Sequence, residues 1–407
     1  MPEQQPIPQS QNAPPVQAPV PQASQSQVPP NNVAQAVPVS GVATMNMGWV
    51  DMLLEAAVKN EASDIYVVAN YYPGMKISGK IVYLSEGFSV LTGENVEEFA
   101  NTLMTDEQKE EYLNELELDF AYTHQKTSGR FRVNVFRQMN FPSVALRYLR
   151  SDIPSLDSLG LPPVFKWLAE RPSGIILLAG PTGSGKSTTL SAMVDYINTN
   201  FIKHIITIED PVEYLHPLKK SIVEQREVGT DTHSFARAMK SALRQNPNVL
   251  VLGEMRDLES ISSAITMAET GHLVFSTIHA RSSVQTINKI IDSFPAEQQA
   301  QIRQQISETL LSVVSQRLVP RVDGEAHPAM AMEIMILNSA IANMVREEQT
   351  HQIESVIQTG KKEGMILLDD DLLRLIQEGK ISVDSALQHS NSPQSLQSKL
   401  ISLGLIK

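Results

Sequence analysis

The sequence contains no cysteine. Disulfide staples, a thiolate nucleophile and any zinc or iron–sulfur site built from cysteine are therefore excluded. The sequence also has no apolar run close to the ~18–20 residues that a membrane-spanning helix needs. Its N-terminus lacks the charged and then apolar segments of an export signal. We therefore expect a cytoplasmic protein, with a peripheral contact to the membrane left open.

Positive charge is scarce as well. The 33 Lys and Arg are outnumbered by 45 Asp and Glu, which gives a formal net charge of −12. Non-specific binding of nucleic acid needs clustered basic side chains, so we expect no nucleic-acid partner, although a local basic groove is compatible with this balance. The 407 residues exceed one ordinary domain, and a hydrophobic fraction of 42% is sufficient for a core in each of two folded units.

Residues 1–45 are rich in Pro, Gln, Ser and Ala and carry almost no charge. Ten of the 24 prolines lie in the first 40 residues. Such a segment cannot bury enough apolar surface to offset its chain entropy, so we expect a disordered arm. It acts either as a solvated tether or as a ligand for a proline-recognising partner.

Residues 46–150 predict a small α+β domain of a PAS-like kind. The stretch "WVDMLLEAAVKNEA" from Trp49 has apolar residues at helical spacing, and residues 95–115 also predict a helix. Strands are expected in "SDIYVV", "GMKISGKIVYL" and "GRFRVNVFRQ". Residues 151–163 contain three prolines and polar breakers, so they predict an interdomain linker.

Residues 164–407 predict a second, α/β domain. A helix is expected near residues 164–170, followed by apolar strands in "GIILLA", "HIITIED", "NVLVLGE" and "HLVFSTIH". Helical patterns separate these strands at residues 187–199, 234–244 and 257–269. This alternation favours a parallel sheet that helices cover on both faces. From about Ala296 to the end, the pattern predicts an almost wholly helical part.

The stretch "GPTGSGKST" follows an apolar strand and opens a helix, which is the context of the phosphate-binding loop G-x-x-x-x-G-K-[ST]. Its glycines let backbone N–H groups approach phosphate oxygens, and the helix N-terminus adds its dipole. We expect Lys186 to reach the β- and γ-phosphates of ATP and the Ser187 hydroxyl to ligate Mg²⁺. The alternative is a glycine-rich turn that binds nothing. The predicted nucleotide-binding residues are Gly180, Pro181, Thr182, Gly183, Ser184, Gly185, Lys186, Ser187 and Thr188.

Acidic side chains follow two of the other strands. "ITIEDPVEY" carries Glu209, Asp210 and Glu213 where nucleotides bind in open α/β sheets, and one of these carboxylates can polarise the attacking water. The alternative is a solvated acidic turn. In "NVLVLGEMRD", Gly253 occupies the place where a Walker B strand usually has an Mg²⁺-binding Asp, and only Glu254 remains.

Two histidines bracket the last of these strands in "ETGHLVFSTIHARSS". A lone histidine is more often a packed or surface residue than a functional one. Here His272 and His279 flank a strand of an ATPase sheet, so one of them is a candidate sensor of the γ-phosphate. A metal site is disfavoured, because the cluster supplies no third ligand at a recognisable spacing.

In this order, the four motifs resemble those of the secretion-type ATPases, the hexameric motors of type IV pili and type II secretion. The stretches "LGEMRDLESI" and "MAETGHLVFSTIH" are similar to the PilT/PilU branch of pilus retraction ATPases. The elements "ASDIYV" and "AIANMVRE" match two further motifs of that branch, and the likeness extends from about residue 47 to residue 407. It implies a RecA-like P-loop ATPase domain.

The resemblance also implies roles for matching residues. Glu213 is expected to be the general base that activates water. Glu254 is expected to support Mg²⁺ through a water molecule, and His279 to read the γ-phosphate. Each of these expectations rests on the position of the residue in the matching motif.

In such hexamers, arginines of the small domain act on the nucleotide of a neighbouring subunit. Arg132 and Arg147 are the candidates here, with Arg130 in reserve. "GRFRVNVF" puts Arg130 and Arg132 on one face of a strand, and the alternative is that they are surface arginines on an edge strand. The resemblance further implies a homo-hexamer that uses ATP and Mg²⁺ to retract type IV pili for twitching motility. Its expected partner is an inner-membrane platform protein, through which alone it would contact the membrane.

Three features depart from the family pattern. Ala342 stands where the branch has arginine, Asn288-Lys289 replaces an Asp-Arg pair, and the tail at residues 385–400 is more similar to PilU than to PilT. The chain is therefore expected to be either the main retraction motor or an accessory paralogue that works beside one.

Three other functions fit the sequence less well. Extension and secretion ATPases usually carry a larger N-terminal region and a tetracysteine zinc element, which the absence of cysteine disfavours. A RecA-like nucleic-acid translocase is disfavoured by the acidic balance. A nucleotide-binding scaffold without hydrolysis is disfavoured because Lys186, Glu213 and Glu254 are all present.

Overall fold

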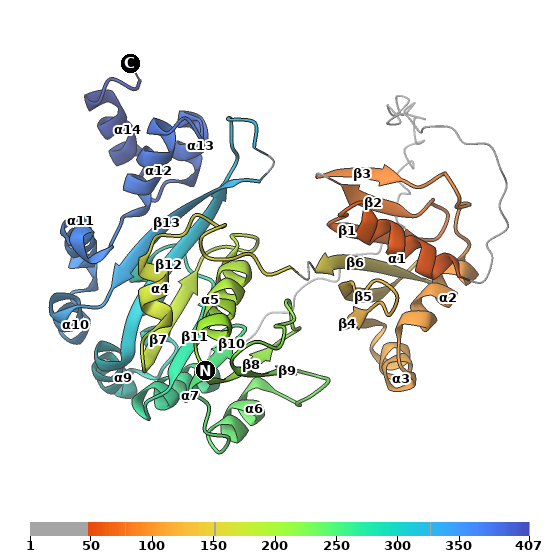
Figure 1. Ribbon diagram of the computed structural model, residues 1–407, viewed down its shortest axis with the longest axis horizontal. Coiled ribbons are helices and arrows are strands. Elements are labelled where there is room, and N and C mark those ends of the chain that lie inside the picture. The colour runs from red at the N-terminus through yellow and green to blue at the C-terminus, as the bar shows by residue number, and fades with distance from the viewer. Residues whose placement is uncertain (1–47, 78, 150–151, 326, 407) are drawn as a thin grey trace, which may run out of the picture.

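The structure, a computed structural model, describes residues 48–77, 79–149, 152–325 and 327–406. The expected disordered arm, residues 1–45, lies outside them. Figure 1 shows a smaller sheet, coloured orange to olive, beside a larger one, coloured yellow-green to blue. Among the described helices, none combines the length and the apolar character needed to cross a membrane.

The smaller unit is an antiparallel sheet in the order β3-β2-β1-β6-β5-β4, with three helices. Its strands are β1 (Asp64–Val68), β2 (Gly74–Ile77), β3 (Lys80–Tyr83), β4 (Glu117–Thr123), β5 (Arg130–Gln138) and β6 (Phe141–Leu149). Its helices are α1 (Trp49–Lys59), α2 (Gly93–Leu103) and α3 (Asp106–Glu115). Along β5, buried Phe131, Val133 and Val135 alternate with partly exposed residues, so one face of the sheet forms the core. The expected α+β unit is confirmed.

The prediction of a single helix at residues 95–115 is wrong, because the chain forms two helices there, α2 and α3. Thr105 begins α3 with a capping box: its hydroxyl accepts the Gln108 N–H, and the Gln108 side chain accepts the Thr105 N–H. The Thr-x-x-Gln spacing was the signal for this break. Strands β4 and β6 were not expected. β4 forms a hairpin with β5, the next strand in the chain, whereas β6 also pairs with β1, which is distant in sequence.

The larger unit has a seven-stranded sheet in the order β13-β12-β7-β11-β10-β8-β9, parallel except for β13. Its strands are β7 (Gly174–Ala179), β8 (His204–Glu209), β9 (Ile222–Glu227), β10 (Val249–Leu252), β11 (Leu273–Ile278), β12 (Leu310–Val319) and β13 (Ala329–Ile336). All residues of β7, β10 and β11 are buried. This is the pattern of central parallel strands with both faces covered, so the predicted α/β fold is confirmed.

Helices on both faces of this sheet surround the strands (Figure 1). The first six are α4 (Val164–Ala169), α5 (Lys186–Asn200), α6 (Phe235–Ala242), α7 (Leu258–Glu269), α8 (Ser283–Asp292) and α9 (Ala296–Thr309). After β13 follow α10 (Ser339–Arg346), η1 (Thr350–Gln352), α11 (Ile353–Thr359), η2 (Gly360–Glu363), α12 (Leu368–Gln377), α13 (Val383–His389) and α14 (Pro393–Ser402). The helices expected at 164–170, 187–199, 234–244 and 257–269 correspond to α4, α5, α6 and α7.

The expectation of an almost wholly helical chain from Ala296 onward is wrong. Strands β12 and β13 interrupt the helices and extend the sheet beyond β7. The β13 sequence "AMAMEIMI" consists largely of residues that favour helices, and seven of its eight residues are buried. Burial on both faces removes the alternation by which a strand is recognised, and pairing with β12 decides the conformation.

Parallel pairing places the carboxyl ends of four strands at one edge of the sheet. Ala179 of β7 is opposite Ile278 of β11, and Leu252 of β10 lies between Ser276 and Ile208 of its two neighbours. The residues that follow these strands therefore lie close together. They include the phosphate-binding loop and the acidic and histidine motifs.

Candidate functional site

The phosphate-binding loop has the backbone conformation that its glycines permit. After buried β7, Gly180, Gly183 and Gly185 have φ values of 147°, 77° and 85°. Residues other than glycine rarely adopt backbone conformations in this left-handed region. Helix α5 then begins at Lys186, and no side chain caps its first turn. The free N–H groups and the dipole of a 15-residue helix thus point at the loop, which is an arrangement that binds phosphate.

Gly180 is also required by close packing. A Cβ atom there would lie 2.5 Å from the Ser184 Oγ and 2.6 Å from the Gln316 carbonyl oxygen. The Ser184 hydroxyl is buried and has no hydrogen-bond partner. A buried hydroxyl without a partner is costly, so a phosphate oxygen fits the chemistry of this loop.

Lys186 lies beneath the loop and is 8% exposed. Its ammonium donates to the carbonyl oxygens of Gly180 (3.0 Å) and Pro181 (2.9 Å). Burial lowers the pKa of Lys186, while the carboxylates of Glu254 and Glu213 oppose this shift. The structure thus brings together the lysine and the two acidic residues that the sequence predicts for one site.

Glu254 follows β10 and lies at the centre of a charged group. One oxygen of its carboxylate is 3.2 Å from the Nε2 atom of His279, which follows β11. The other oxygen accepts a hydrogen bond from the Nε atom of Arg256 at 2.8 Å. Arg256 also lies 3.6 Å from the carboxylate of Asp210. Arg256 therefore connects the two acidic motifs, and its only signal in the sequence was its place two residues after Glu254.

Three acidic residues, Glu209, Asp210 and Glu213, lie at or just beyond the end of β8, and the Glu209 carboxylate is already engaged in hydrogen bonds. Burial raises the pKa of Glu209, and its oxygens already accept from the Thr207 hydroxyl (2.7 Å) and the Gln225 amide (3.5 Å). The Glu213 backbone N–H also donates to Glu209, at 3.4 Å. Glu209 and Glu213 are both half-buried, and the role of Glu213 as general base stays a prediction.

The structure explains why glycine stands at position 253. A Cβ atom there would lie 3.3 Å from the Glu209 Cα and 3.5 Å from the Ile208 carbonyl oxygen. The Gly253 N–H donates to that carbonyl at 2.8 Å, and the Gly253 carbonyl accepts from the Thr277 hydroxyl at 2.6 Å. Strands β8 and β10 thus approach too closely at this point for a side chain of aspartate to enter without a shift.

The two histidines lie at opposite ends of β11. His272 precedes the strand, and its Nδ1 atom is 2.9 Å from the Met267 carbonyl oxygen, so it closes the turn after α7. His279 lies at the site and is 42% exposed. The Lys289 ammonium donates to the His279 carbonyl oxygen at 3.0 Å.

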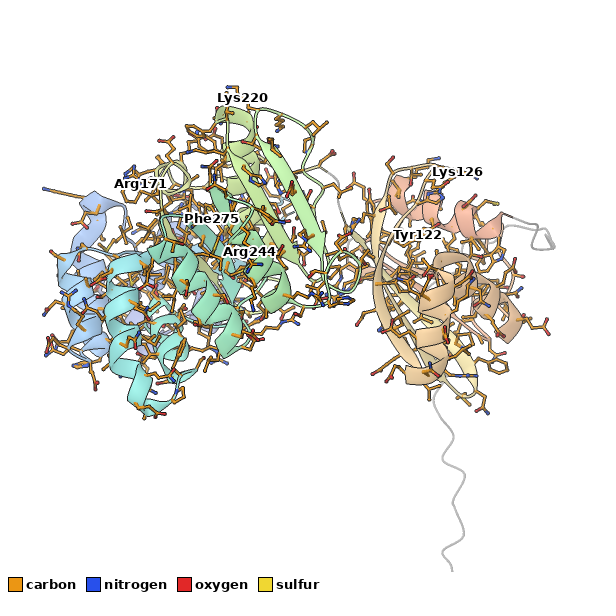
Figure 2. All side chains as sticks on the ribbon, turned by 90° about the horizontal axis from the view of Figure 1, so that it is seen from below. Tyr122, Lys126, Arg171, Lys220, Arg244 and Phe275 are labelled. Carbon is orange, nitrogen blue, oxygen red and sulfur yellow. The ribbon has the colours of Figure 1, made fainter. Side chains whose placement is uncertain are left out.

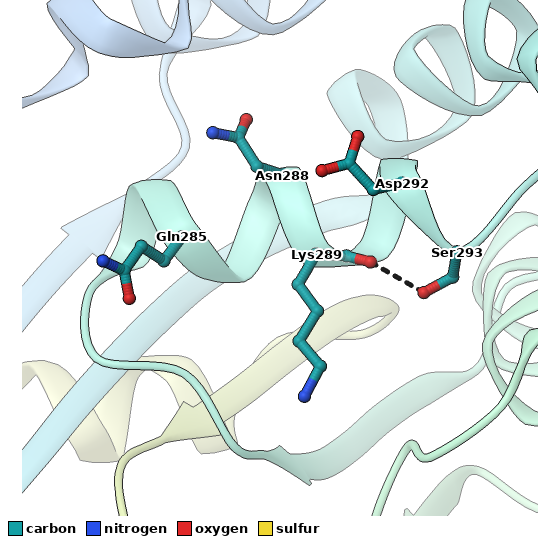
Figure 3. A pocket seen from close by; sticks show the side chains of 5 residues that line it. All are labelled: Gln285, Asn288, Lys289, Asp292 and Ser293. Carbon is teal, nitrogen blue, oxygen red and sulfur yellow. Dashed lines mark hydrogen bonds between the residues drawn. The ribbon is translucent and has the colours of Figure 1, made fainter.

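Lys289 belongs to a shallow pocket on α8, shown in Figure 3. Its lining residues are Gln285, Asn288, Lys289, Asp292 and Ser293. The Lys289 side chain points away from the side chains of Asn288 and Asp292. The Lys289 backbone carbonyl accepts a hydrogen bond from the Ser293 hydroxyl. All of these lining residues belong to α8 and its C-terminal cap Ser293, and the pocket is linked to the site through the hydrogen bond from Lys289 to the His279 carbonyl oxygen.

Arg132 and Arg147 are not brought to the loop of their own chain. They lie directly opposite each other on β5 and β6, on the face of the small sheet away from its core. Arg147 is 63% exposed and lies 3.2 Å from Asp64. Their expected action on a neighbouring subunit stays a prediction. Arg130, by contrast, contacts the larger unit of its own chain through Val212 and Glu227.

The residues at the loop fit a magnesium ion held together with a nucleotide. Ser187 is half-buried in the first turn of α5, and Thr188 is fixed by a 3.0 Å hydrogen bond to the Tyr214 hydroxyl. Within the described parts of the chain, no group of three or more His, Cys, Asp or Glu residues could by itself hold a metal. Mg²⁺ commonly takes one or two protein ligands and completes its shell with phosphates and water, as Ser187 and a water-linked Glu254 would allow.

Known proteins are similar to this chain over most of its length. The family model of the Type II/IV secretion system proteins matches residues 45–401. The chain is 42% identical to the Type IV pilus retractation ATPase PilT of Pseudomonas aeruginosa over 342 residues, 84% of this chain and 98% of that protein. It is 36% identical to the Type IV pilus ATPase PilU of the same organism over 354 residues, 87% of this chain and 91% of that one.

A solved structure is also similar. The crystal structure of the pilus retraction motor PilT with bound ADP matches with a TM-score of 0.81 at 40% identity, over 87% of this chain and all of that one. The chain therefore belongs to the family of Type II/IV secretion system proteins. Within that family it is a member of the PilT/PilU branch of pilus retraction ATPases, as its motifs predict. The RecA-like fold class is confirmed at the same time.

Proposed function

We propose that this chain is an ATP-hydrolysing motor that drives the retraction of type IV pili and so supports twitching motility. The observation that carries the proposal is the meeting of Lys186, Glu213 and Glu254 at one edge of the sheet, in a chain of the PilT/PilU branch. Bound ADP in the PilT structure supports ATP as the nucleotide. Nucleotide then binds between the α5 N-terminus and the acidic edge.

In the proposed mechanism, the loop N–H groups and Lys186 hold the phosphates. Glu213 takes a proton from the attacking water, and the hydrogen bond from its N–H to Glu209 supports its backbone. His279, 3.2 Å from Glu254, reads the γ-phosphate. Mg²⁺, held by Ser187 and by Glu254 through water, would neutralise charge that develops on the phosphate oxygens.

The working form is proposed to be a homo-hexamer. Arg132 and Arg147 support this assembly, because they lie on an uncovered face of the small sheet and do not contact the loop of their own chain. Residues 151–163 serve as the hinge between the units. Force passes to an inner-membrane platform protein, so the motor lies at the inner face of the membrane and contacts it peripherally.

Experiment distinguishes two roles in retraction. As the main motor, the protein would retract pili alone. As an accessory paralogue, it would work beside a second retraction ATPase, which the PilU-like tail supports. The alternative is a pilus-extension or secretion ATPase, which hydrolyses ATP in the same way but drives extension or secretion instead of retraction.

The test is deletion of the gene in its host, followed by counts of surface pili and of twitching. The strain is restored with wild type, with Lys186→Ala or with Lys220→Ala, which changes an exposed lysine of the same unit as a matched control. Excess pili that wild type and Lys220→Ala cure, but Lys186→Ala does not, support an ATP-driven retraction motor. Cells without pili would mean extension, and normal pili that retract weakly under load would mean the accessory role.

A further inference from the structure

One side chain of the small unit reaches into the acidic motif of the larger unit of the same chain. Arg130, the first residue of β5, donates from its Nε atom to the Val212 carbonyl oxygen at 3.1 Å. Its terminal nitrogen pairs with the carboxylate of Glu227 at the end of β9. The two side chains are only 17% and 9% exposed. This is a desolvated contact rather than a surface ion pair.

Glu227 also contacts Val212, so that Arg130, Glu227 and Val212 form a closed set of hydrogen bonds, which we call the Arg130 ring. The same carboxylate oxygen that pairs with Arg130 accepts the Val212 N–H at 3.0 Å. Its other oxygen accepts from the Thr230 hydroxyl at 3.2 Å. A single guanidinium–carboxylate pair thus holds both the N–H and the carbonyl of Val212, which is itself 3% exposed. Charge-assisted hydrogen bonds of this kind are stronger than neutral ones.

Val212 immediately precedes Glu213, the proposed base. Its carbonyl belongs to the peptide bond that leads into Glu213, and the Glu213 N–H in turn donates to Glu209. The orientation of this peptide decides where the Glu213 side chain points. A displacement of about 1 Å in a reacting group can cost about a hundredfold in rate.

Around the ring, the two units are not closely packed. A cleft of about 520 Å³ lies between the α2–α3 turn and β4 on one side and the acidic motif on the other. Tyr122 lines it from the small unit, on the side that faces the larger unit in Figure 2, and Leu215 and Asp231 line it from the larger unit. The Arg130 ring bridges this cleft, so a rotation of the small unit would break it.

We propose that Arg130 is a positioning residue for hydrolysis: it holds the Val212–Glu213 peptide, so that a subunit hydrolyses ATP only while its small unit is docked on its own ATPase unit. The proposal rests on the proposed role of Glu213 as base. Under this proposal, the position of the small unit controls the rate of ATP hydrolysis in the same chain. This is separate from the action of Arg132 and Arg147 on a neighbour.

The first test compares Arg130→Ala and Arg130→Lys with wild type in full-length protein, by steady-state ATPase kinetics and by the affinity for a fluorescent ADP. Arg137→Ala is the matched control, because Arg137 lies on the same strand, is exposed and donates to the Asn140 carbonyl oxygen of the small unit. We expect kcat to fall about tenfold or more in Arg130→Ala. The affinity for ADP should change less than twofold, because the loop is untouched.

Arg130→Lys should recover part of kcat, since an ammonium reaches one of the two acceptors but lacks the planar fork. It also shows that a loss in Arg130→Ala is not a failure to fold, and the thermal unfolding temperature of each variant checks this directly. An unchanged kcat in Arg130→Ala, or equal losses of kcat and ADP affinity, would overturn the proposal. An inactive wild type would instead count against the proposed function.

A second test separates action within one chain from action on a neighbour. Arg130→Ala subunits, which keep Glu213, are mixed with Glu213→Gln subunits, which keep Arg130. If Arg130 serves its own chain, neither kind of subunit has both groups, and the mixture stays as slow as its components. If mixing restores ATPase activity, Arg130 acts across an interface and the proposal is wrong.

Discussion

At the scale of single residues, Gly253 shows how packing excludes an acidic side chain at the Walker B position. We predict that Gly253→Asp, which restores the aspartate usual there, destabilises the protein by about 1–3 kcal/mol, because its Cβ would crowd the Glu209 backbone. The added carboxylate would also lie beside the half-buried Glu209. Thermal unfolding and ATPase assays measure both effects.

Gly253→Ala is the control for Gly253→Asp, since it adds the same Cβ without the charge. The backbone there is not in the left-handed region, so strain in φ plays no part. Alanine should cost less stability than aspartate, and the difference reports the buried charge. An aspartate variant with unchanged unfolding temperature and faster hydrolysis would show that the crowding is unimportant.

His216 gives the protein a stability that depends on pH. Burial lowers its pKa to about 4, from an ordinary value of 6.5, and Lys219 adds to this shift while Asp195 opposes it. A neutral imidazole is therefore favoured in the folded state. Its contribution is complete above pH 6.5 and is lost as the pH falls toward 4, because protons then bind preferentially to the unfolded chain.

We therefore predict that wild type loses more stability than His216→Phe when the pH falls from 7 to 5. The extra loss should be at most about 2 kcal/mol. Chemical denaturation at both pH values measures it. His351→Phe is the control, because His351 is exposed. The same dependence in wild type and His216→Phe would assign the titration to another group.

At the scale of elements, helix α8 supports the histidine loop. Lys289 donates from α8 to the His279 carbonyl oxygen at 3.0 Å. We predict that Lys289→Met slows hydrolysis about fivefold, which corresponds to the loss of about 1 kcal/mol from one exposed charged hydrogen bond. Lys289→Arg should retain most of the rate. If Lys289→Met keeps the rate of wild type, His279 is positioned by β11 alone.

The phosphate-binding loop was predictable because every part of it is local. One strand, three glycines and the first turn of α5 lie within residues 174–190. The approach of Lys186 to Glu213 and Glu254 was predictable from the rule that parallel strands end at one edge. These parts of the site therefore follow from local sequence motifs and from one general rule of parallel sheets.

Other parts could not be read from local patterns. Arg130 and Glu227 are 97 residues apart in sequence, and nothing in either segment indicates the other. Strand β13 carries helix-favouring residues, and its conformation is decided by β12. β6 likewise pairs with β1, which is distant in sequence. Tertiary pairing decides such elements, and a single sequence does not display it.

At the scale of the whole molecule, one face of the small sheet is proposed to serve two purposes. Arg130 and Arg132 alternate with buried residues on β5, and Arg147 lies opposite Arg132. If Arg130 is engaged with its own chain, the other two arginines remain available to a neighbour. The proposed ring would then link the site of one subunit to the site of the next through a single rigid sheet.

This arrangement requires that the small unit keeps its shape when it undocks. Its core and that of the larger unit consist of separate sets of residues: Phe131 and Phe99 lie in the first, and Phe275 lies in the middle of the second (Figure 2). We therefore propose that the two units unfold as separate cooperative bodies, joined across the cleft by the Arg130 ring.

The prediction is that Phe131→Ala and Phe275→Ala each shift a different transition in calorimetry. Both side chains are fully buried, so each truncation should cost about 3–5 kcal/mol in its own unit. Arg130→Ala should leave the unfolding temperature of the larger unit unchanged and remove only the coupling between the unfolding of the two units. Phe131→Leu, which keeps an apolar side chain, should shift the small unit less than Phe131→Ala. If either truncation shifts a single common transition, the two cores unfold together, and the prediction of two separate cooperative units is wrong.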